Sequence, residues 1–411
     1  MIKKYVIKFD NDNFNNIEDF ISWAFINKEL VEDREFVIEN DLKEIDTCDI
    51  ENIISFLKYY LKVRKLCDKS IKEYNNTLRK LSNNKELQTA LDEFIRMNDS
   101  GKFLRAALVG IGYNAGNKKD YNYLDLAIAL EVFQTSILIH DDLIDKAKVR
   151  RGKYTIPVSY AKKYKKNLTQ DFIEQRNDFS NSIALCLGDM GFYLAEEIII
   201  NSYKNHKQLP EVLSYYHQTA IKTCLGEILD VTLPFKEKFY KTDSKLENKI
   251  IEVYKLKTAW YSVVGPYCLG LTLANQNKNE IKKMEELLLN IGIAFQIKDD
   301  LLGIYGDDRH LGKSTNSDIE EYKQTILYSY TMKTKYKKDL LQYYGKKNLT
   351  KKEMMKVKQI FEKSGAKEYA TETMNNLFKS SIIKLKQQKF INEKSKKILL
   401  GFIIYLSNRT K

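Results

Sequence analysis

The segment YLDLAIALEVFQTSILIHDDLIDKAKVRRGK, residues 123–153, decides the fold. Its first two thirds are apolar on most faces of a helix, which is typical of a central, buried helix. The segment then carries three aspartates, Asp141, Asp142 and Asp145, followed by Arg150 and Arg151. Carboxylates without partners are costly to bury. Either cations neutralise these aspartates, or this end of the helix faces water.

Apolar runs of the same kind recur along the chain and predict an all-α fold. They include NIISFLKYYLKVRKL, NSIALCLGDMGFYLAEEIII, YYHQTAIKTCLGEILDV and MEELLLNIGIAFQIKDDLLGIYG. Only four prolines and 17 glycines interrupt the 411 residues, which favours long helices over a turn-rich β fold. We predict a single large helical bundle, residues 51–411, packed around a deep central cavity.

Other parts of the chain do not follow this pattern. Residues 1–50 are rich in acidic and aromatic residues with short mixed periods, and they are predicted to form an N-terminal appendage of unknown role. Whether it is a small separate unit or an extra helical layer stays open. Polar stretches at 161–181 and 235–246 are predicted to be surface connections, and the lysine-rich tail from about residue 335 is predicted to be helical.

Composition narrows the class of protein. The 68 lysines and arginines against 55 acidic residues give a net charge of +13, but the lysines are spread along the chain and no nucleic-acid motif accompanies them. We therefore expect no nucleic-acid partner. No 18-residue apolar run predicts a membrane span, and the N-terminal residues lack the apolar region of a signal peptide. Five cysteines without a CxxC motif fit a reduced, cytoplasmic location.

The acidic residues predict a metal site. On a helix, Asp141 and Asp145 lie one turn apart on the same face, and hard carboxylates at that spacing suit Mg²⁺. A second acidic pair, Asp299 and Asp300, ends another apolar run, FQIKDDLLGIYG. Two such helix ends facing each other could hold a diphosphate through bridging metal ions. On these residues alone, solvated helix ends remain the alternative.

Cations near these motifs complete a site for phosphate groups. Arginine offers a planar fork to phosphate oxygens, and lysine offers a point charge. The candidates are Lys102, Arg105, Arg150, Arg151, Lys257, Lys313 and Lys323. Any one of them alone is expected to be an ordinary surface cation, but their arrangement around two acidic motifs indicates a diphosphate site.

Together these motifs resemble those of the trans-isoprenyl (polyprenyl) diphosphate synthases of the farnesyl/geranylgeranyl type. SGKFLRA resembles the family's G-K-x-x-R segment, and DDLIDKAKVRRGK resembles its first aspartate-rich motif with the trailing R-R-G. CLGDMGFYLA, CLGEILD, KTA, FQIKDDLLG and the terminal NRTK resemble later family motifs in the family's order. The resemblance spans roughly residues 60–411.

The resemblance implies an isoprenoid synthase fold, a homodimer and two or three Mg²⁺ ions per site. The implied metal ligands are Asp141, Asp142, Asp145, Asp299 and Asp300. The implied ligands of isopentenyl diphosphate are Lys102, Arg105, Gln134 and Arg151, and those that act on the allylic diphosphate are Arg150, Lys257 and Lys323, with Lys313 as a further diphosphate ligand. Thr258 and Gln296 are expected to offer oxygen dipoles to the allylic cation.

The implied reaction joins isopentenyl diphosphate to dimethylallyl, geranyl or farnesyl diphosphate. The growing tail is expected to run beside the first aspartate helix, past Ile137 and Phe133, which lie one and two turns below Asp141. Ser136 is small where farnesyl-producing members often carry an aromatic ring. The missing ring predicts a product of geranylgeranyl length or longer, although a neutral packing role for Ser136 stays open.

Departures from the family pattern leave two other functions open. Gly303 stands where many members carry a third aspartate of the second motif, and Glu227 replaces a more usual glutamine. A non-catalytic subunit that tunes a partner synthase is therefore one alternative. A class I terpene cyclase is the other, although a cyclase binds no second diphosphate and has no need of both GKFLR and VRRGK.

Overall fold

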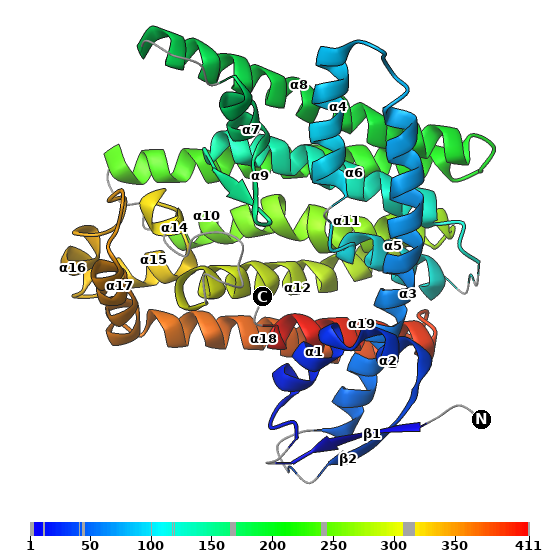
Figure 1. Cartoon of the computed structure of the whole chain (residues 1–411). Coiled ribbons are helices and arrows are strands. Elements are labelled where there is room, and N and C mark those ends of the chain that lie inside the picture. Colours follow the sequence, from blue (N-terminus) through cyan, green and yellow to red (C-terminus); the bar gives the residue numbers. More distant parts are fainter. Residues whose placement is uncertain are drawn as a thin grey trace.

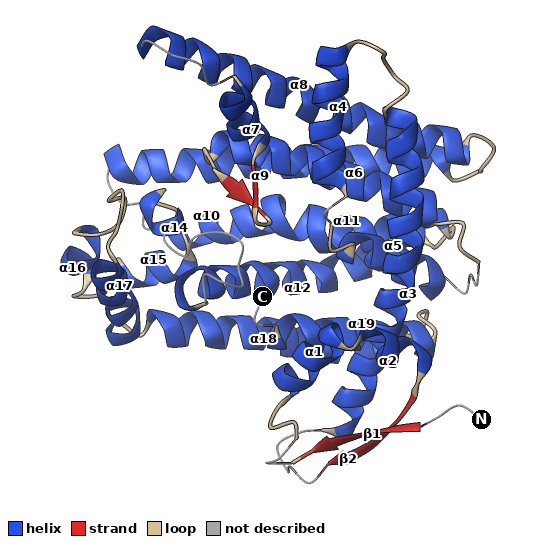
Figure 2. Cartoon of the chain, viewed as in Figure 1, coloured by secondary structure: helices blue, strands red, loops and turns tan. Residues whose placement is uncertain are grey.

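The computed structural model describes the chain except residues 1–3, 11–12, 41, 43–45, 100, 117, 119, 165–169, 240–244, 307–316 and 410–411. Long helices stacked in layers make up most of the molecule (Figure 1). In the described residues, strands occur only in two small two-stranded sheets (Figure 2). The predicted all-α fold class is confirmed.

The layers that carry the acidic motifs are built from the most apolar segments. They comprise α5 (Leu104–Ala115), α6 (Leu124–Ile144), α8 (Gln170–Tyr203), α9 (Leu209–Phe239), α10 (Leu246–Val253), α11 (Gly265–Leu273) and α12 (Lys278–Tyr305). A π-helical stretch, η1 (Tyr254–Val264), joins α10 to α11. Helix α6 buries nearly every residue from Leu126 to Ser136, as expected of a central helix whose apolar residues cover all faces.

The remaining helices surround these layers. They are α3 (Thr47–Leu78), α4 (Lys85–Asn98), α7 (Ile156–Lys163), α14 (Ser317–Glu320), α15 (Ile326–Thr331), α16 (Lys337–Leu341), α17 (Lys351–Lys363), α18 (Ala366–Gln387) and α19 (Glu393–Asn408). Helix α18 packs against α12, and α19 packs against α3 (Figure 1). The lysine-rich tail is helical, as predicted.

The prediction of surface connections at 161–181 and 235–246 was largely wrong. Helix α7 continues to Lys163, α8 begins at Gln170, and α9 continues to Phe239. The inward positions of the first turns of α8 include Arg176 and Ser180, so this part of the helix lacks the apolar period that predicts one.

The N-terminal region combines helices with a sheet. Strands β1 (Lys4–Phe9) and β2 (Glu35–Asn40) pair in parallel, joined by α1 (Ile17–Ile26) and α2 (Lys28–Asp33). Helix α3 begins at Thr47, capped by the Asp46 side chain, so it crosses the expected boundary at residue 51. The division into an appendage and a main domain remains a prediction.

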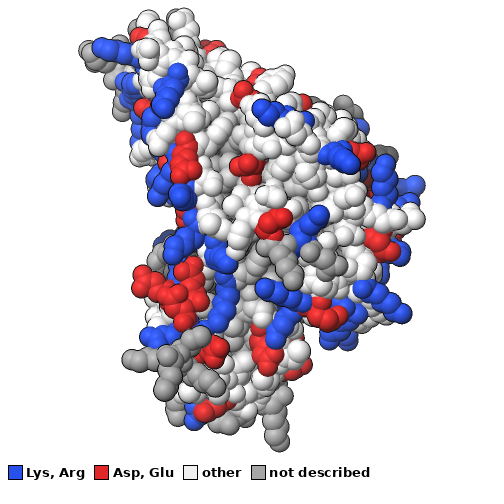
Figure 3. All heavy atoms as spheres, turned by 90° about the vertical axis from the view of Figure 1, so that its right-hand side faces the viewer, with Lys and Arg blue, Asp and Glu red and all other residues white. Residues whose placement is uncertain are grey.

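Lysine and arginine side chains are dispersed and mixed with acidic ones on the face in Figure 3. This pattern agrees with the spread of lysines along the sequence. None of the helices in the described part of the chain is long and apolar enough to span a membrane.

Candidate active site

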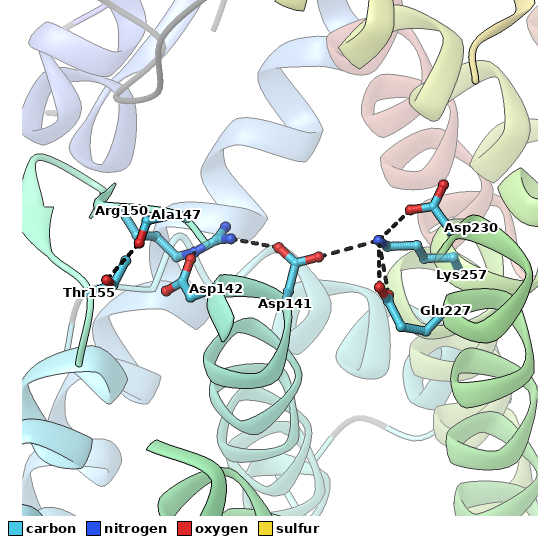
Figure 4. Close-up of polar contacts among 8 residues, drawn as sticks. All are labelled: Asp141, Asp142, Ala147, Arg150, Thr155, Glu227, Asp230 and Lys257. Atoms are coloured by element: carbon cyan, nitrogen blue, oxygen red, sulfur yellow. Dashed lines mark hydrogen bonds and ion pairs between the residues drawn. The ribbon is translucent and has the colours of Figure 1, made fainter. Parts of the chain in front are cut away.

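The first acidic motif lies at the end of α6, between two cations. The Asp141 carboxylate lies 2.6 Å from Arg150 Nη2 on one side and 3.3 Å from Lys257 Nζ on the other (Figure 4). Asp145 caps the same helix. Asp141 is therefore neutralised by cations from elements on both sides of it.

A short hairpin brings Arg150 back over the end of α6. Strands β3 (Val149–Arg150) and β4 (Lys153–Tyr154) pair antiparallel, and the turn between them places Arg151 and Gly152 at φ 52° and 73°. Positive φ is easily adopted by glycine and uncommon for other residues. The turn lets Arg150 Nε donate to Asp142 Oδ1 at 2.6 Å.

Lys257 is held in a carboxylate cluster from α9. Its Nζ lies 2.9 Å from Glu227 Oε2 and 2.6 Å from Asp230 Oδ2. Burial lowers the pKa of Lys257, but Asp230 and Asp141 outweigh it, so the net pKa is raised. A Cβ added at Gly226 would lie 2.2 Å from the Lys257 backbone nitrogen. Glycine is therefore required for α9 to approach η1 this closely.

The second acidic motif joins η1 to α12. Thr258 Oγ1 donates to Gln296 Oε1 at 2.6 Å, and Gln296 Nε2 donates to Asp300 Oδ1 at 2.8 Å. Asp300 also accepts from the Tyr254 hydroxyl. Asp299 pairs with Arg409, just beyond the end of α19. The predicted residues Thr258, Gln296 and Asp300 thus form one hydrogen-bonded chain.

Each acidic pair contains one more accessible and one buried carboxylate. The side chains of Asp141 and Asp299 are 16% and 40% exposed, whereas Asp142 and Asp300 are 2% and 3% exposed as whole residues. Burial raises the pKa of Asp142 to about 6 and that of Asp300 to about 7. Asp141 and Asp299 are therefore the better candidates for metal ligands.

Lys323 links the two motifs. It is partly buried, and burial lowers its pKa, but the charges of Asp318, Asp230, Asp145 and Asp141 raise the net pKa well above the usual value for lysine. Its charge also acts on Asp300, whose pKa it lowers. The two acidic helix ends therefore lie close enough to share one partly buried cation.

Asp318 occupies the space beside Gly303. A Cβ added at Gly303 would lie 2.8 Å from Asp318 Oδ2. A carboxylate from α14 thus stands where the third aspartate of the second motif would begin. Sequence reasoning missed Asp318, and also Asp230 beside Lys257. Asp230 lies within the CLGEILD motif, about one helical turn after Glu227, so the two carboxylates share a helix face. This spacing could have identified Asp230 from the sequence.

A second group of cations gathers where α5 begins. Arg105 Nη2 donates to Ser262 Oγ at 2.8 Å, and its guanidinium lies 4.3 Å from the Tyr261 ring centre. Glu131, buried in α6, accepts from the Ala106 N–H at 3.0 Å. The Glu131 carboxylate raises the pKa of Arg151, which burial lowers more strongly. Glu131 was another residue that the sequence analysis missed.

Two further predicted residues of this group come from different parts of the chain. Lys102 is exposed two residues before α5, and Gln134 is 9% exposed on α6. Arg105 Nε is buried without a hydrogen-bond partner among the described residues. Lys313 lies outside the described residues.

The predicted chain-length residues occupy the middle of α6. Ser136 is fully buried, and a Cβ added at Gly191 of α8 would lie 2.0 Å from its Oγ. This contact gives Ser136 a packing reason to be small. Phe133 packs its ring 5.5 Å from Phe192 and 5.3 Å from Tyr216. Ile137 is only partly buried against the same core.

Oxygen ligands are available, but they do not form a closed metal cage. In the part of the chain that the structure describes, no three His, Cys, Asp or Glu side chains converge to hold a metal ion by themselves. Mg²⁺ usually keeps several waters and binds through one or two carboxylates plus substrate phosphates. Carboxylates at two helix ends fit that manner of binding, in which substrate supplies the missing oxygens.

Comparisons with known proteins agree with this geometry. The sequence model of the polyprenyl synthetase family matches residues 84–363. A geranylgeranyl diphosphate synthase from Saccharolobus solfataricus is 31% identical over 308 residues, covering 72% of this chain and 84% of that protein. A short chain isoprenyl diphosphate synthase from Methanocaldococcus jannaschii is 28% identical over 302 residues, covering 70% of this chain and 83% of that protein.

The fold agrees as well. A geranylgeranyl pyrophosphate synthase from Corynebacterium glutamicum, crystallised with isoprenyl diphosphate and magnesium, superposes with a TM-score of 0.74 at 23% identity. The superposition covers 86% of this chain and 99% of that one. With the acidic motifs, the cations and the helical layers in place, the chain belongs to the polyprenyl synthetase family of trans-isoprenyl diphosphate synthases.

Proposed function

We propose that this chain condenses isopentenyl diphosphate with an allylic diphosphate to give a longer trans-polyprenyl diphosphate. The observation that carries the proposal is the position of Asp141 between Arg150 and Lys257, close enough to Lys323 for its charge to raise the pKa of that lysine. Family membership supports it, as do the relatives named as isoprenyl and geranylgeranyl diphosphate synthases.

Two or three Mg²⁺ ions are the proposed cofactors. Asp141, Asp145 and Asp299 would hold them, and Asp318 stands close enough to Gly303 to take the place of the third aspartate. When bound with substrate, Mg²⁺ supplies Lewis-acid stabilisation of the diphosphate leaving group. The Corynebacterium glutamicum synthase was crystallised with isoprenyl diphosphate and magnesium, and a polyprenyl synthase from Caulobacter crescentus with isoprenyl diphosphate and calcium, which supports the use of divalent ions here.

The chain's own cations stabilise the charge that develops as the allylic C–O bond breaks. Lys257 is held by carboxylates before substrate arrives, and the partly buried Lys323 lies in the field of aspartates of the same site, so little reorganisation is needed. Arg150 presents a planar guanidinium to phosphate oxygens. Bond cleavage leaves an allylic cation and free pyrophosphate. The oxygens of Thr258 and Gln296, fixed by their mutual hydrogen bond, would offer their dipoles to that cation.

The second substrate binds at the group around the start of α5. Lys102, Arg105, Gln134 and Arg151 hold the diphosphate of isopentenyl diphosphate, and the unpartnered Nε of Arg105 is a donor available to it. The double bond of isopentenyl diphosphate attacks the allylic cation, and a proton is then lost to a pyrophosphate oxygen. No histidine is needed as a base.

The proposed product is of geranylgeranyl length or longer. Phe133 lies eight residues before Asp141 on α6, which corresponds to about 12 Å along the helix axis. The ring layer of Phe133, Phe192 and Tyr216 is buried there and would form the floor that stops the tail. The small size of Ser136 does not by itself predict the product length, because Gly191 packs against this residue.

We also propose that two copies of this chain pair. Apolar side chains on α9 recur every three to four residues and are half or more exposed: Ile221, Leu225, Ile228, Val231 and Phe235. A continuous apolar stripe of this kind marks an interaction surface, and a second copy would bury it. Sedimentation of wild type and of Ile228→Glu tests this, with a shift to monomer expected in the variant. The cytoplasmic location expected from the cysteines remains a prediction.

One assay tests the activity and its rivals. The purified chain is incubated with Mg²⁺, labelled isopentenyl diphosphate and dimethylallyl, geranyl or farnesyl diphosphate, and product length is measured. A non-catalytic subunit would give no product, and a cyclase would convert the allylic substrate without incorporating label. In Lys102→Ala/Arg105→Ala, condensation should be lost while release of pyrophosphate from the allylic substrate persists.

A further inference from the structure

The N-terminal unit, residues 4–40, lies outside the 84–363 range that matches the family. It packs against α3 and α19 at one end of the bundle (Figure 1). Phe9, Phe20 and Val31 form its fully buried centre. From α3, Lys58 Nζ donates to the Arg34 carbonyl at 2.5 Å. The unit is therefore fastened to a helix of the main bundle.

Phe25 of α1 joins this unit to two aromatic residues of the bundle. Its ring centre lies 6.0 Å from that of Tyr60 on α3 and 5.7 Å from that of Tyr405 on α19. Phe56 contacts the same two rings at 5.8 Å and 5.4 Å. Tyr60 and Tyr405 are buried, at 2% and 7% exposure. These four residues, the aromatic cluster, fix α1, α3 and α19 against one another.

The aromatic cluster reaches the isopentenyl diphosphate group through Tyr60. The Tyr60 hydroxyl donates to the Lys102 carbonyl at 2.6 Å. Lys102 precedes Phe103, which has a φ of 56° and is the N-cap residue of α5. A non-glycine residue with positive φ persists only where surrounding contacts hold it. Arg105 follows in the first turn of α5. The hydroxyl thus fixes the backbone between two proposed substrate cations.

The cluster reaches the second acidic motif through Tyr405. Arg409 follows Tyr405 by one helical turn, pairs with Asp299 and lies over the Phe295 ring at 4.2 Å. Glu18 of α1 also acts on Lys298, beside Asp299, and raises its pKa against the lowering effect of burial. The N-terminal unit therefore contacts the supports of both substrate groups.

We infer that Tyr60 and Phe25 are positioning residues, through which the N-terminal unit holds the Lys102 backbone in the conformation that binds isopentenyl diphosphate. The inference rests on the proposed function. Tyr60 acts through Lys102, and Phe25 acts through Tyr60. Because the Tyr60 hydroxyl donates to the Lys102 carbonyl on the isopentenyl side, its loss should affect the two substrates unequally.

The test compares Tyr60→Phe with Tyr74→Phe in the full-length chain. Both residues are on α3, and the buried Tyr74 hydroxyl has no hydrogen-bond partner among the described residues. Loss of one neutral hydrogen bond at Lys102 should raise KM for isopentenyl diphosphate about fivefold. The KM for the allylic substrate and kcat should change less than about twofold, and Tyr74→Phe should match wild type.

A second pair of variants tests the N-terminal unit itself. Phe25→Ala should raise the KM for isopentenyl diphosphate, and Phe25→Tyr should keep the wild-type value. Ile26→Ala, which changes a side chain that is 83% exposed, should match wild type. An unchanged isopentenyl KM in Tyr60→Phe overturns the inference, as does an equal rise in both KM values. Absence of synthase activity in wild type would instead refute the proposed function, so the two failures are distinguishable.

Discussion

Replacing Lys257 by alanine tests the carboxylate cluster at the centre of the site. The substitution removes a cation that lies 2.6 Å from Asp230, 2.9 Å from Glu227 and 3.3 Å from Asp141. Asp141 keeps Arg150 as a partner, but Glu227 and Asp230 lose the cation between them. The side chains of the cluster are only 12–20% exposed, so water replaces the lost cation poorly.

The expected loss follows from that burial. Removing one partner of a buried ion pair lowers the free energy of unfolding by about 3–5 kcal/mol. Because the cluster keeps some exposure, we expect a loss at the low end, about 3 kcal/mol. The deficit should also depend on pH. Burial already raises the pKa of Glu227, and Lys257 lowers it. Without Lys257 the folded variant binds protons more readily than the unfolded chain, so its deficit should shrink as pH falls from 8 to 5.

The assay is urea unfolding of the metal-free protein at several pH values. Lys255→Ala is the matched control in the same π-helical stretch, because Lys255 pairs with Glu252 at 3.6 Å with both side chains more than 40% exposed. That exposed pair should contribute less than about 1 kcal/mol. The reasoning is refuted if Lys257→Ala loses no more stability than Lys255→Ala, or if its deficit is the same at pH 5 and pH 8.

Three further predictions concern the tail floor and the two acidic motifs. Phe133→Ala should lengthen the product by at least one five-carbon unit and lower stability by about 3 kcal/mol. Chromatography of labelled products measures the length, and an unchanged length would contradict the proposal that Phe133 stops the growing tail. The metal-free wild-type protein should lose stability as pH rises from 4 to 7. The reason is that folded Asp300, with a pKa of about 7, keeps a proton that the unfolded chain releases near pH 4. Asp300→Asn should remove the Asp300 share of this dependence, on the order of 4 kcal/mol, in urea unfolding across pH. A smaller slope should remain because the pKa of Asp142 is also raised, to about 6, and a slope equal to that of wild type would contradict the prediction. Glu227→Gln should lower KM for the allylic diphosphate about threefold by removing one negative charge beside Lys257, and steady-state kinetics showing a rise would count against that placement.

The helical architecture and the two acidic helix ends were predictable because both leave periodic signals. Long runs that are apolar on most helix faces marked α6 and α12, and each run ended in an acidic pair. Adjacent residues on a helix point about 100° apart, so one carboxylate of each pair must face inward. Which one is buried depends on the neighbouring helices. The positions of η1 and the β3–β4 hairpin decide it, and neither follows from local pattern.

Other parts of the site depend on contacts between distant segments. Asp318 lies 15 residues after Gly303, on a four-residue helix with no periodic signal of its own. The N-terminal sheet pairs two strands in parallel, and such strands need a crossover that local propensity does not predict. The early start of α8 was not predictable because its first turns include the inward polar residues Arg176 and Ser180, which break the apolar period. Each of these features required the packed structure.

The proximity of Asp318 to Gly303 has a consequence for engineering by consensus. A redesign guided by an alignment of the family would introduce aspartate at position 303. In this chain that substitution would place the new Cβ 2.8 Å from Asp318 Oδ2, so the Asp318 carboxylate would have to rotate away and two negative groups would lie side by side. Combining Gly303→Asp with Asp318→Gly would introduce the aspartate without that contact.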